Sequence, residues 1–186
     1  HCQLAVKPNA SRNTTTRDST VEIYRFDWEN AYLKWRECVE QEPKKPNQQQ
    51  WQVLDLVHAR CRYEHEEEVR HEINKTTGPK QWSPLFRLIH GLPGSGKSKL
   101  LLWLQSYFEK VWLWEQGVHF QFLAPLNGMA VSIAGQTIHS WGGISFGNNS
   151  GIKVGSGIVK KSQSDIEQMI LRCARLRFIF IDECGC

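Results

Sequence analysis

A glycine-rich turn between two patterned segments constrains the fold more than any other feature of the chain. Its residues are Gly91-Leu92-Pro93-Gly94-Ser95-Gly96-Lys97-Ser98. They fit the spacing G-x-x-x-x-G-K-[ST] of a phosphate-binding loop. The apolar run at 84–91 is typical of a buried parallel strand, and the pattern at 100–112 is typical of a helix. A strand, a loop and a helix in this order predict an α/β domain built on a parallel sheet.

The loop carries the chemistry of a polyphosphate site. Its glycines let the backbone wrap closely around phosphate, while backbone N–H groups and the helix N-terminus supply positive potential. Lys97 is predicted to reach the β- and γ-phosphates, and the hydroxyl of Ser98 is predicted to bind Mg²⁺. The loop alone leaves kinases, GTPases, transporters and motors open.

An acidic motif near the C-terminus selects among these classes. The apolar residues Phe178–Ile181 predict a buried strand that ends in Asp182 and Glu183, where a Walker B pair belongs. Asp182 is expected to hold Mg²⁺ through its water shell, and Glu183 to orient and polarise the attacking water. A small-molecule kinase does not require Glu183, and Asn74-Lys75 precedes the loop and lacks the following Asp of a guanine-reading motif. We therefore predict ATP hydrolysis, with Lys97, Asp182 and Glu183 as catalytic residues.

The chain before the loop divides into two parts. Residues 27–40 carry an aromatic stripe at helical spacing, with Asp27 as the expected cap. Such a stripe is either a partner or nucleic-acid surface or, more commonly, a core face. Residues 42–50 break the pattern with two prolines and indicate a linker, after which a second helix starts at Gln50 and a charged, exposed helix follows. We predict a polar N-terminal extension with one amphipathic helix at 1–45 and a domain at 46–186.

Composition limits the possible functions. The chain has 186 residues, of which 40% are hydrophobic and 23% charged, as in a globular protein. A net charge of +4 permits contact with nucleic acid without arguing for it. No apolar run approaches the roughly 18 residues of a membrane span, and the six cysteines form no pair of C-x-x-C clusters. We expect reduced thiols and an intracellular protein that does not enter a membrane.

The segment between the two motifs carries candidate DNA contacts. Residues 118–124 predict a strand, a helix is expected next, and a glycine-flanked stretch follows. Thr137, His139 and Trp141 in this stretch offer a hydroxyl, an imidazole and an indole to phosphates and bases. Equally, Ile138 and Trp141 simply anchor the stretch to the core. Both interpretations stay open.

The order of these motifs resembles that of the Pif-type DNA helicases of superfamily one, which include those of Helitron-type transposons. That family has the phosphate loop, an A-P-T-G-x-A-A segment, a T-I-H-S segment and an I-D-E strand in this order. The corresponding segments here begin at Ala124, Thr137 and Ile181. Within PNQQQWQVLDLV, Gln50 stands at the glutamine of the family's adenine-recognising motif. The resemblance covers residues 46–183.

The resemblance implies a RecA-like P-loop NTPase domain with a parallel sheet, truncated after the Walker B strand, as the incomplete first motor domain of a helicase. The implied activity is ATP-dependent unwinding of single-stranded or forked DNA with 5′ to 3′ polarity, in the nucleus, serving DNA repair, recombination and telomere maintenance. ATP and Mg²⁺ are the implied cofactors. The nucleotide is assigned to residues 91–98 and Gln50, and the metal to Ser98 and Asp182.

Two departures from the family pattern leave a second interpretation open. Leu126-Asn127 stands where the family has Thr-Gly, and Cys184-Gly185 follows the acid pair where the family has a small apolar residue and Ser. The alternative is an ATP-binding and DNA-binding module, or an inactive transposon-derived relic, without motor activity. Because the chain begins at His1 and stops at Cys186, we expect a fragment that cannot unwind DNA by itself, since such motors need a second domain and its arginine.

Overall fold

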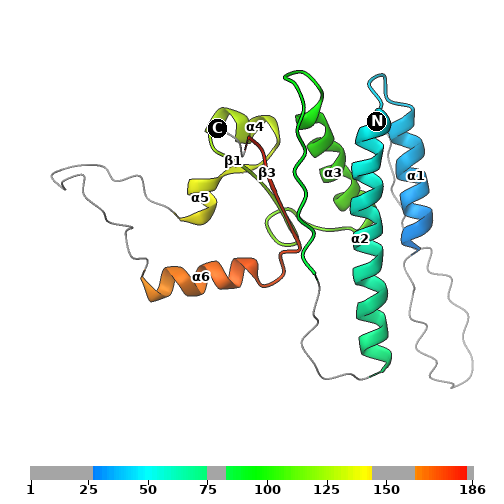
Figure 1. The fold of residues 1–186 in the computed structure, drawn as a ribbon. Helices are drawn as coiled ribbons and strands as arrows, with labels where there is room; N and C mark the ends of the chain where they lie inside the picture. The colour runs from blue at the N-terminus through cyan, green and yellow to red at the C-terminus, as the bar shows by residue number, and fades with distance from the viewer. Residues whose placement is uncertain (1–26, 75–82, 144–161, 184–186) are drawn as a thin grey trace, which may run out of the picture.

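The computed structural model describes residues 27–74, 83–143 and 162–183. These segments combine helices with a small parallel sheet, so the predicted α/β class is confirmed (Figure 1). In chain order the elements are α1 (Trp28–Glu40), α2 (Gln48–Ile73), α3 (Lys97–Val111), β1 (Phe120–Ala124), α4 (Asn127–Ser132), β2 (Gln136–Thr137), α5 (Ile138–Gly142), α6 (Gln163–Cys173) and β3 (Phe178–Ile181). The polar residues 1–26 of the predicted extension lie outside the described part.

Within the described residues the sheet has three parallel strands in the order β2-β1-β3. β1 lies in the centre, with Leu123 opposite Gln136 of β2 and its first four residues paired with β3. The strands predicted at 118–124 and 178–181 are therefore both present, although the first begins at Phe120. Because all strands run the same way, their carboxyl ends meet at one edge, at the top of Figure 1.

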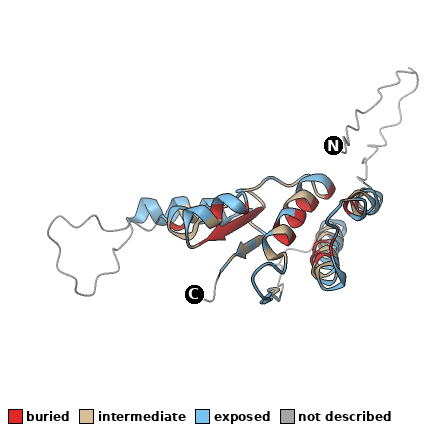
Figure 2. Cartoon of the chain, turned by 90° about the horizontal axis from the view of Figure 1, so that it is seen from above, coloured by how far each residue is buried: buried red, intermediate tan, exposed pale blue. Residues whose placement is uncertain are grey.

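α3 lies between the sheet and the helices α1 and α2 (Figure 1, Figure 2). Phe108 of α3 is fully buried, and its ring packs against Phe120, Phe178 and Phe180 of the sheet. The buried residues of α3 are Leu100, Leu101, Trp103, Leu104, Tyr107, Phe108 and Val111. A helix covered on two sides needs apolar residues over most of its circumference, which explains the apolar run after the loop.

α1 packs its aromatic stripe into the core, so the core interpretation of that stripe is confirmed. The helix starts after Asp27, whose carboxylate accepts a 3.0 Å hydrogen bond from a backbone N–H of the first turn. Tyr32, Trp35 and Val39 are buried in the same cluster as the residues of α3. Nε1 of Trp35 donates a 3.1 Å hydrogen bond to Oγ of Ser106, which ties the two helices together.

α2 is one continuous helix of 26 residues, where the sequence suggests a buried helix followed by an exposed one. A capping box starts it: the side chain of Asn47 accepts from the backbone N–H of Gln50, and the Gln50 side chain accepts from that of Asn47. Leu54, Val57 and Cys61 of its first half belong to the core. The division between residues 45 and 46 stays a prediction, but helices on both sides of it contribute to the same core.

The strand predicted at residues 84–91 is absent. Residues 83–96, all of them described, form an irregular segment that leads into the loop. Its apolar side chains are exposed, Phe86 by 80% and Leu88 by 74%. A strand needs a neighbouring edge for its backbone groups. In the described sheet β2 and β3 are the outer strands, and residues 84–91 pair with neither of them. The prediction is wrong because a short apolar run does not reveal whether such a partner exists.

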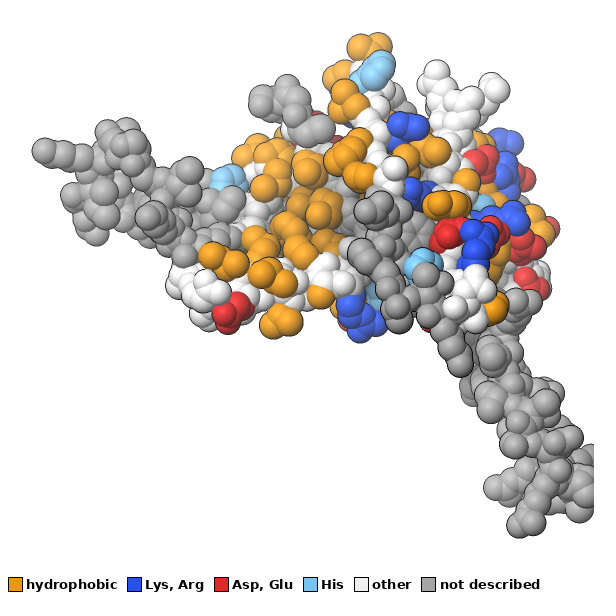
Figure 3. All heavy atoms as spheres, turned by 60° about the horizontal axis from the view of Figure 1, so that its bottom comes forward, with side chains coloured by type: hydrophobic (Ala, Val, Ile, Leu, Met, Phe, Trp, Pro, Cys, Tyr) orange, Lys and Arg blue, Asp and Glu red, His pale blue; other side chains and the backbone are white. Residues whose placement is uncertain are grey.

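β3 is half-buried on one face and exposed on the other, which corrects the expectation of a buried strand. Phe178 and Phe180 pack on the core, whereas Ile179 and Ile181 are 47% and 48% exposed. No residue of α6 (Gln163–Cys173), which is described throughout, is buried. Apolar side chains accordingly gather on one face of the molecule (Figure 3).

Candidate nucleotide site

The glycine-rich turn uses left-handed glycines and opens directly into α3. Gly94 and Gly96 have φ angles of 80° and 86°, which residues with a Cβ rarely adopt. Gly96 is the N-cap residue of α3, and Lys97 is the first residue of that helix. A Cβ on Gly96 would also lie 2.7 Å from Nε2 of Gln50. The backbone therefore requires glycine here, and the start of a helix adjoins the loop as the sequence predicts.

The turn has an internal hydrogen bond, and most of its residues are exposed to solvent. The backbone N–H of Ser95 donates to the carbonyl of Leu92 at 3.1 Å. A Cβ on Gly91 would lie 2.8 Å from Oγ of Ser95, so the two ends of the turn are close. Leu92 is 81% exposed, and Ser98 in the first turn of α3 is also exposed. An anion in solution therefore has access to the loop and to the hydroxyl of Ser98.

Lys97 folds back over the turn. Its Nζ donates to the carbonyl oxygens of Gly91 at 2.8 Å and of Leu92 at 3.3 Å. These two neutral acceptors hold the ammonium group beside the loop, where a phosphate would provide a stronger, charged acceptor. The contact of Lys97 with the β- and γ-phosphates stays a prediction.

Asp182 and Glu183 follow β3 at the carboxyl edge of the sheet. The backbone N–H of Asp182 donates to Leu123 of β1 at 2.8 Å, and Oδ1 of Asp182 accepts from the backbone N–H of Glu183 at 3.2 Å. Glu183 has a φ angle of 57°, in the left-handed region that is uncommon for residues other than glycine. Figure 1 places this end of β3 and the glycine-rich turn at the same end of the molecule.

Ser98 and Asp182 are the predicted Mg²⁺ ligands. Two protein oxygens suffice for Mg²⁺ when phosphate oxygens and water complete its octahedral shell. The described residues contain no group of three or more His, Cys, Asp or Glu side chains that would bind a metal independently of a nucleotide. The metal site stays a prediction.

Gln50 links α2 to the phosphate loop. Its Nε2 donates to the carbonyl oxygens of Ser95 and Gly96, both at 3.3 Å. Its Oε1 accepts from the backbone N–H of Asn47 at 2.9 Å. Both ends of the amide are therefore in use. Adenine recognition by Gln50 stays a prediction. Oε1 keeps a second lone pair for a base N–H, whereas donation from Nε2 to the base requires one of its two present bonds to break.

Thr137 ends β2 and is the N-cap residue of α5, in which His139 and Trp141 follow, and all three are half-buried. Oγ1 of Thr137 caps α5 by accepting from the backbone N–H of Ser140 at 3.1 Å, which leaves the hydroxyl proton for another acceptor. The carbonyl of Trp141 accepts a 3.2 Å hydrogen bond from Arg172 of α6. This geometry is compatible with both the DNA-contact and the anchoring interpretation.

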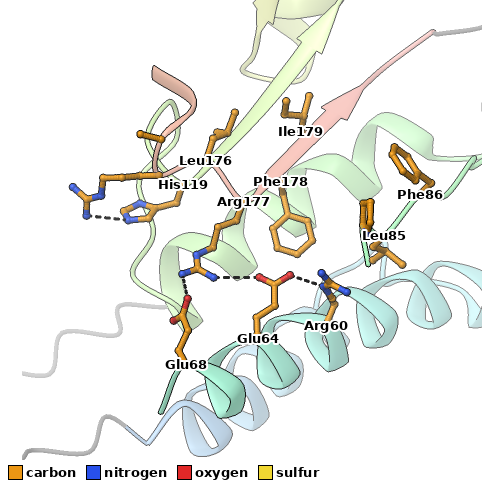
Figure 4. A pocket seen from close by; sticks show the side chains of 13 residues that line it. Arg60, Glu64, Glu68, Leu85, Phe86, His119, Leu176, Arg177, Phe178 and Ile179 are labelled. Carbon is orange, nitrogen blue, oxygen red and sulfur yellow. Dashed lines mark hydrogen bonds and ion pairs between the residues drawn. The ribbon is translucent and has the colours of Figure 1, made fainter. Parts of the chain in front are cut away.

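A pocket of about 760 Å³ opens at the opposite edge of the sheet, where β3 starts (Figure 4). Four of its charged residues form ion pairs: Glu64 binds Arg60 and Arg177, and Arg177 also binds Glu68. A fifth, Arg175, lies 3.4 Å from Nε2 of His119. None of the predicted nucleotide-site residues lines the pocket. The pocket is not predictable from the sequence, because no motif spans α2, the segment before the loop and β3.

Glu42 is a further residue that the sequence analysis does not identify. Its carboxylate forms an ion pair with Nζ of Lys99 at 3.0 Å and accepts a hydrogen bond from Nε1 of Trp103 at 3.1 Å, both in α3. A glutamate in a proline-rich linker carries no signal of such a contact.

No helix in the described part of the chain combines the length and the apolarity needed to cross a bilayer. Comparison with family models, with curated proteins and with solved structures found no match for this chain. The function of the candidate site is therefore inferred from the geometry of its own residues.

Proposed function

We propose that the protein is part of an ATP-dependent DNA helicase, which binds Mg·ATP at residues 91–98 and couples its hydrolysis to movement on single-stranded or forked DNA. In this proposal the parallel sheet and α3 belong to a RecA-like P-loop NTPase fold of the Pif type, with 5′ to 3′ polarity. The observation that carries it is the phosphate loop. Its glycines Gly94 and Gly96 are left-handed, and Lys97 begins α3 and lies against the loop carbonyls.

The residues of the site divide the chemistry among them. Lys97 and the N-terminus of α3 offset the negative charge of the β- and γ-phosphates. Ser98 and Asp182 hold Mg²⁺, which supplies a counter-charge where the phosphoryl group is transferred. Glu183 accepts a hydrogen bond from the attacking water and takes its proton. Backbone strain of the kind found at Glu183 is common at functional sites, which supports this role.

The topology supports DNA contact close to the nucleotide. α5 begins at the carboxyl end of β2, and the acid pair follows the carboxyl end of β3 in the same parallel sheet. Thr137, His139 and Trp141 therefore lie at the edge of the sheet where the nucleotide is proposed to bind. A hydroxyl proton on Thr137 and a half-buried indole on Trp141 suit a phosphate and a stacked base.

One observation favours a second candidate, a nucleotide-dependent binding module without motor activity. Leu126, which stands where the helicase motif that this segment resembles has threonine, is 61% exposed and is the N-cap residue of α4 without a side-chain capping bond. An exposed leucine offers no hydroxyl to a DNA phosphate. A protein that keeps its ATP site but no longer couples hydrolysis to DNA is expected to lose such a DNA-contacting hydroxyl while its nucleotide motif stays complete.

Steady-state ATP hydrolysis with and without single-stranded DNA separates the two candidates. A helicase motor is expected to hydrolyse ATP faster when DNA is added, and Asp182→Asn, which weakens Mg²⁺ binding, is expected to abolish both rates. Hydrolysis that does not respond to DNA would favour the binding module. Hydrolysis that persists unchanged in Asp182→Asn would contradict the assigned site.

A further inference from the structure

The connection between α1 and α2 reaches the first turns of α3. Within this connection, Glu42 forms an ion pair with Nζ of Lys99 at 3.0 Å and accepts a hydrogen bond from Nε1 of Trp103 at 3.1 Å. Lys99 and Trp103 are four residues apart, so their side chains share one face of the helix. Trp103 is only 3% exposed, and its indole N–H needs an acceptor. One carboxylate therefore spans the helical turn that follows the phosphate loop.

A second contact holds the loop itself. Nε2 of Gln50 donates to the carbonyls of Ser95 and Gly96 at 3.3 Å, while its Oε1 is fixed by the N-terminus of α2. The carbonyl of Gly96 also accepts from the backbone N–H of Leu100 at 3.0 Å, the bond that joins the loop to α3. The α1–α2 hairpin (residues 28–73) thus contacts both sides of the junction between the loop and α3. Gln50 contacts the loop residues that precede the junction, and Glu42 contacts the helical residues that follow it.

We propose that Glu42 is a positioning residue for the phosphate loop, and that with Gln50 it makes the α1–α2 hairpin part of the nucleotide site. Glu42 acts through Lys99 and Trp103 and does not itself contact the ligand. The identity of the ligand, ATP, rests on the proposed function. The stabilisation of the loop by Glu42 and Gln50 does not depend on that identity.

Charge explains why a carboxylate suits this position. Lys97 and Lys99 both lie at the N-terminus of α3, where the helix dipole disfavours cations. Glu42 neutralises Lys99, and the Lys99 ammonium also lies 5.1 Å from the ring centre of Trp103. With Lys99 held there, Lys97 is the lysine that lies against the loop carbonyls.

Hydrogen exchange of two backbone amides tests whether Glu42 stabilises the loop in the nucleotide-free protein. The amides of Ser95 and Leu100 are hydrogen-bonded within the loop and across its junction with α3, so their exchange reports local opening. Glu42→Ala removes both contacts and is expected to speed exchange at these amides roughly tenfold. Glu42→Gln keeps an acceptor for Trp103 and loses the ion pair, so we expect a rise of roughly threefold.

Glu40→Gln is the matched control, because it removes the same charge two residues away, where Glu40 pairs with Arg36 of α1. We expect it to leave exchange at Ser95 and Leu100 unchanged. Thermal midpoints of all variants separate local opening from global unfolding. Unchanged exchange at the two amides in both Glu42 variants, or an equal rise throughout α1, α2 and α3, would overturn the positioning role.

Nucleotide affinity separates the inference from the proposed function. If an ATP analogue binds the parent protein, Glu42→Gln is expected to weaken binding roughly threefold, and Lys99→Met is expected to abolish that effect, because Glu42→Gln acts through Lys99. If the analogue does not bind but the amides respond as expected, the proposed function fails and the positioning role stands. If it binds and neither affinity nor exchange responds to Glu42, the positioning role fails.

Discussion

At the scale of single residues, hydrogen bonds and a ring stack around His58 join α1, α2 and α3. Nε1 of Trp112 donates to the hydroxyl oxygen of Tyr107 at 2.6 Å, and that hydroxyl lies 2.9 Å from Nδ1 of His58. The rings of Tyr32 and His58 stack with centroids 3.7 Å apart. Because the Tyr107 oxygen accepts from Trp112, its proton is available to a neutral His58. Burial, followed by the charge of Arg62, lowers the pKa of His58 to about 4.

The low pKa of His58 predicts a loss of stability in acid. Its ordinary value is 6.5, so between pH 6.5 and about 4 the unfolded state binds more protons than the folded state. The contribution of His58 is therefore complete above pH 6.5 and falls as the pH drops toward 4. Arg36 also lowers this pKa, whereas Asp55 raises it. Allowing for partial exposure of the ring, we expect a loss of about 1 to 2 kcal/mol in the free energy of unfolding.

Urea unfolding at pH 7.5 and pH 4.5 measures this loss, with His58→Asn as the reference protein. Carboxylates titrate in the same range in both proteins, so the difference between them isolates His58. A pH dependence of equal size in the two proteins would contradict the assignment.

Substitution of Glu183 is expected to separate nucleotide binding from hydrolysis. An amide cannot take the proton of the attacking water, so Glu183→Gln should lower kcat by about 100-fold or more while the affinity for ATP stays similar. Glu167→Gln, on the exposed helix α6, makes the same charge change outside the site and should retain the parent rate. If Glu183→Gln hydrolyses ATP as fast as the parent protein, Glu183 is not the base.

At the scale of elements, the attachment of α1 depends on Trp35. Its side chain is 1% exposed, packs edge-on against Trp51 and Tyr107, and donates to Ser106. Trp35→Ala is expected to lower the free energy of unfolding by about 3 to 5 kcal/mol, because it leaves a large cavity. Leu33→Ala, at a position of the same helix that is 58% exposed, should change it by less than about 0.5 kcal/mol. Urea unfolding measures both, and similar small changes would place α1 outside the core.

Helices of this chain are more predictable from sequence than its strands. α1 carries its own signals, the cap Asp27 and an apolar stripe, and its hydrogen bonds are internal. A strand depends on a partner that is distant in sequence. Phe178–Ile181 and residues 84–91 are both apolar runs, yet the first pairs with β1 and the second forms no strand. Local pattern does not distinguish the two cases.

At the scale of the whole molecule, the glycine-rich turn and the acid pair lie at the same end of the fold. The position of Asp182 is predictable from the parallel sheet, because it follows the carboxyl end of β3. The turn has no strand before it, and its position follows from the packing of α3, which begins at Lys97, against the sheet. The contacts of Gln50 and Glu42 with the loop and α3 are not predictable in the same way, since they depend on how α1 and α2 pack on α3. The site therefore draws on residues from both sides of the predicted division at 45/46.

The central claim is that residues 91–98 bind the phosphates of ATP. Equilibrium titration of the protein with a fluorescent ATP analogue in the presence of Mg²⁺ tests it directly, with Lys97→Ala and Lys110→Ala compared with the parent. Lys110 lies in the last turn of the same helix, so the control removes an equal charge at the other end of α3. We expect Lys97→Ala to weaken binding by about tenfold or more and Lys110→Ala to leave it unchanged. Equal affinity in all three proteins, or no binding by the parent, would contradict the claim.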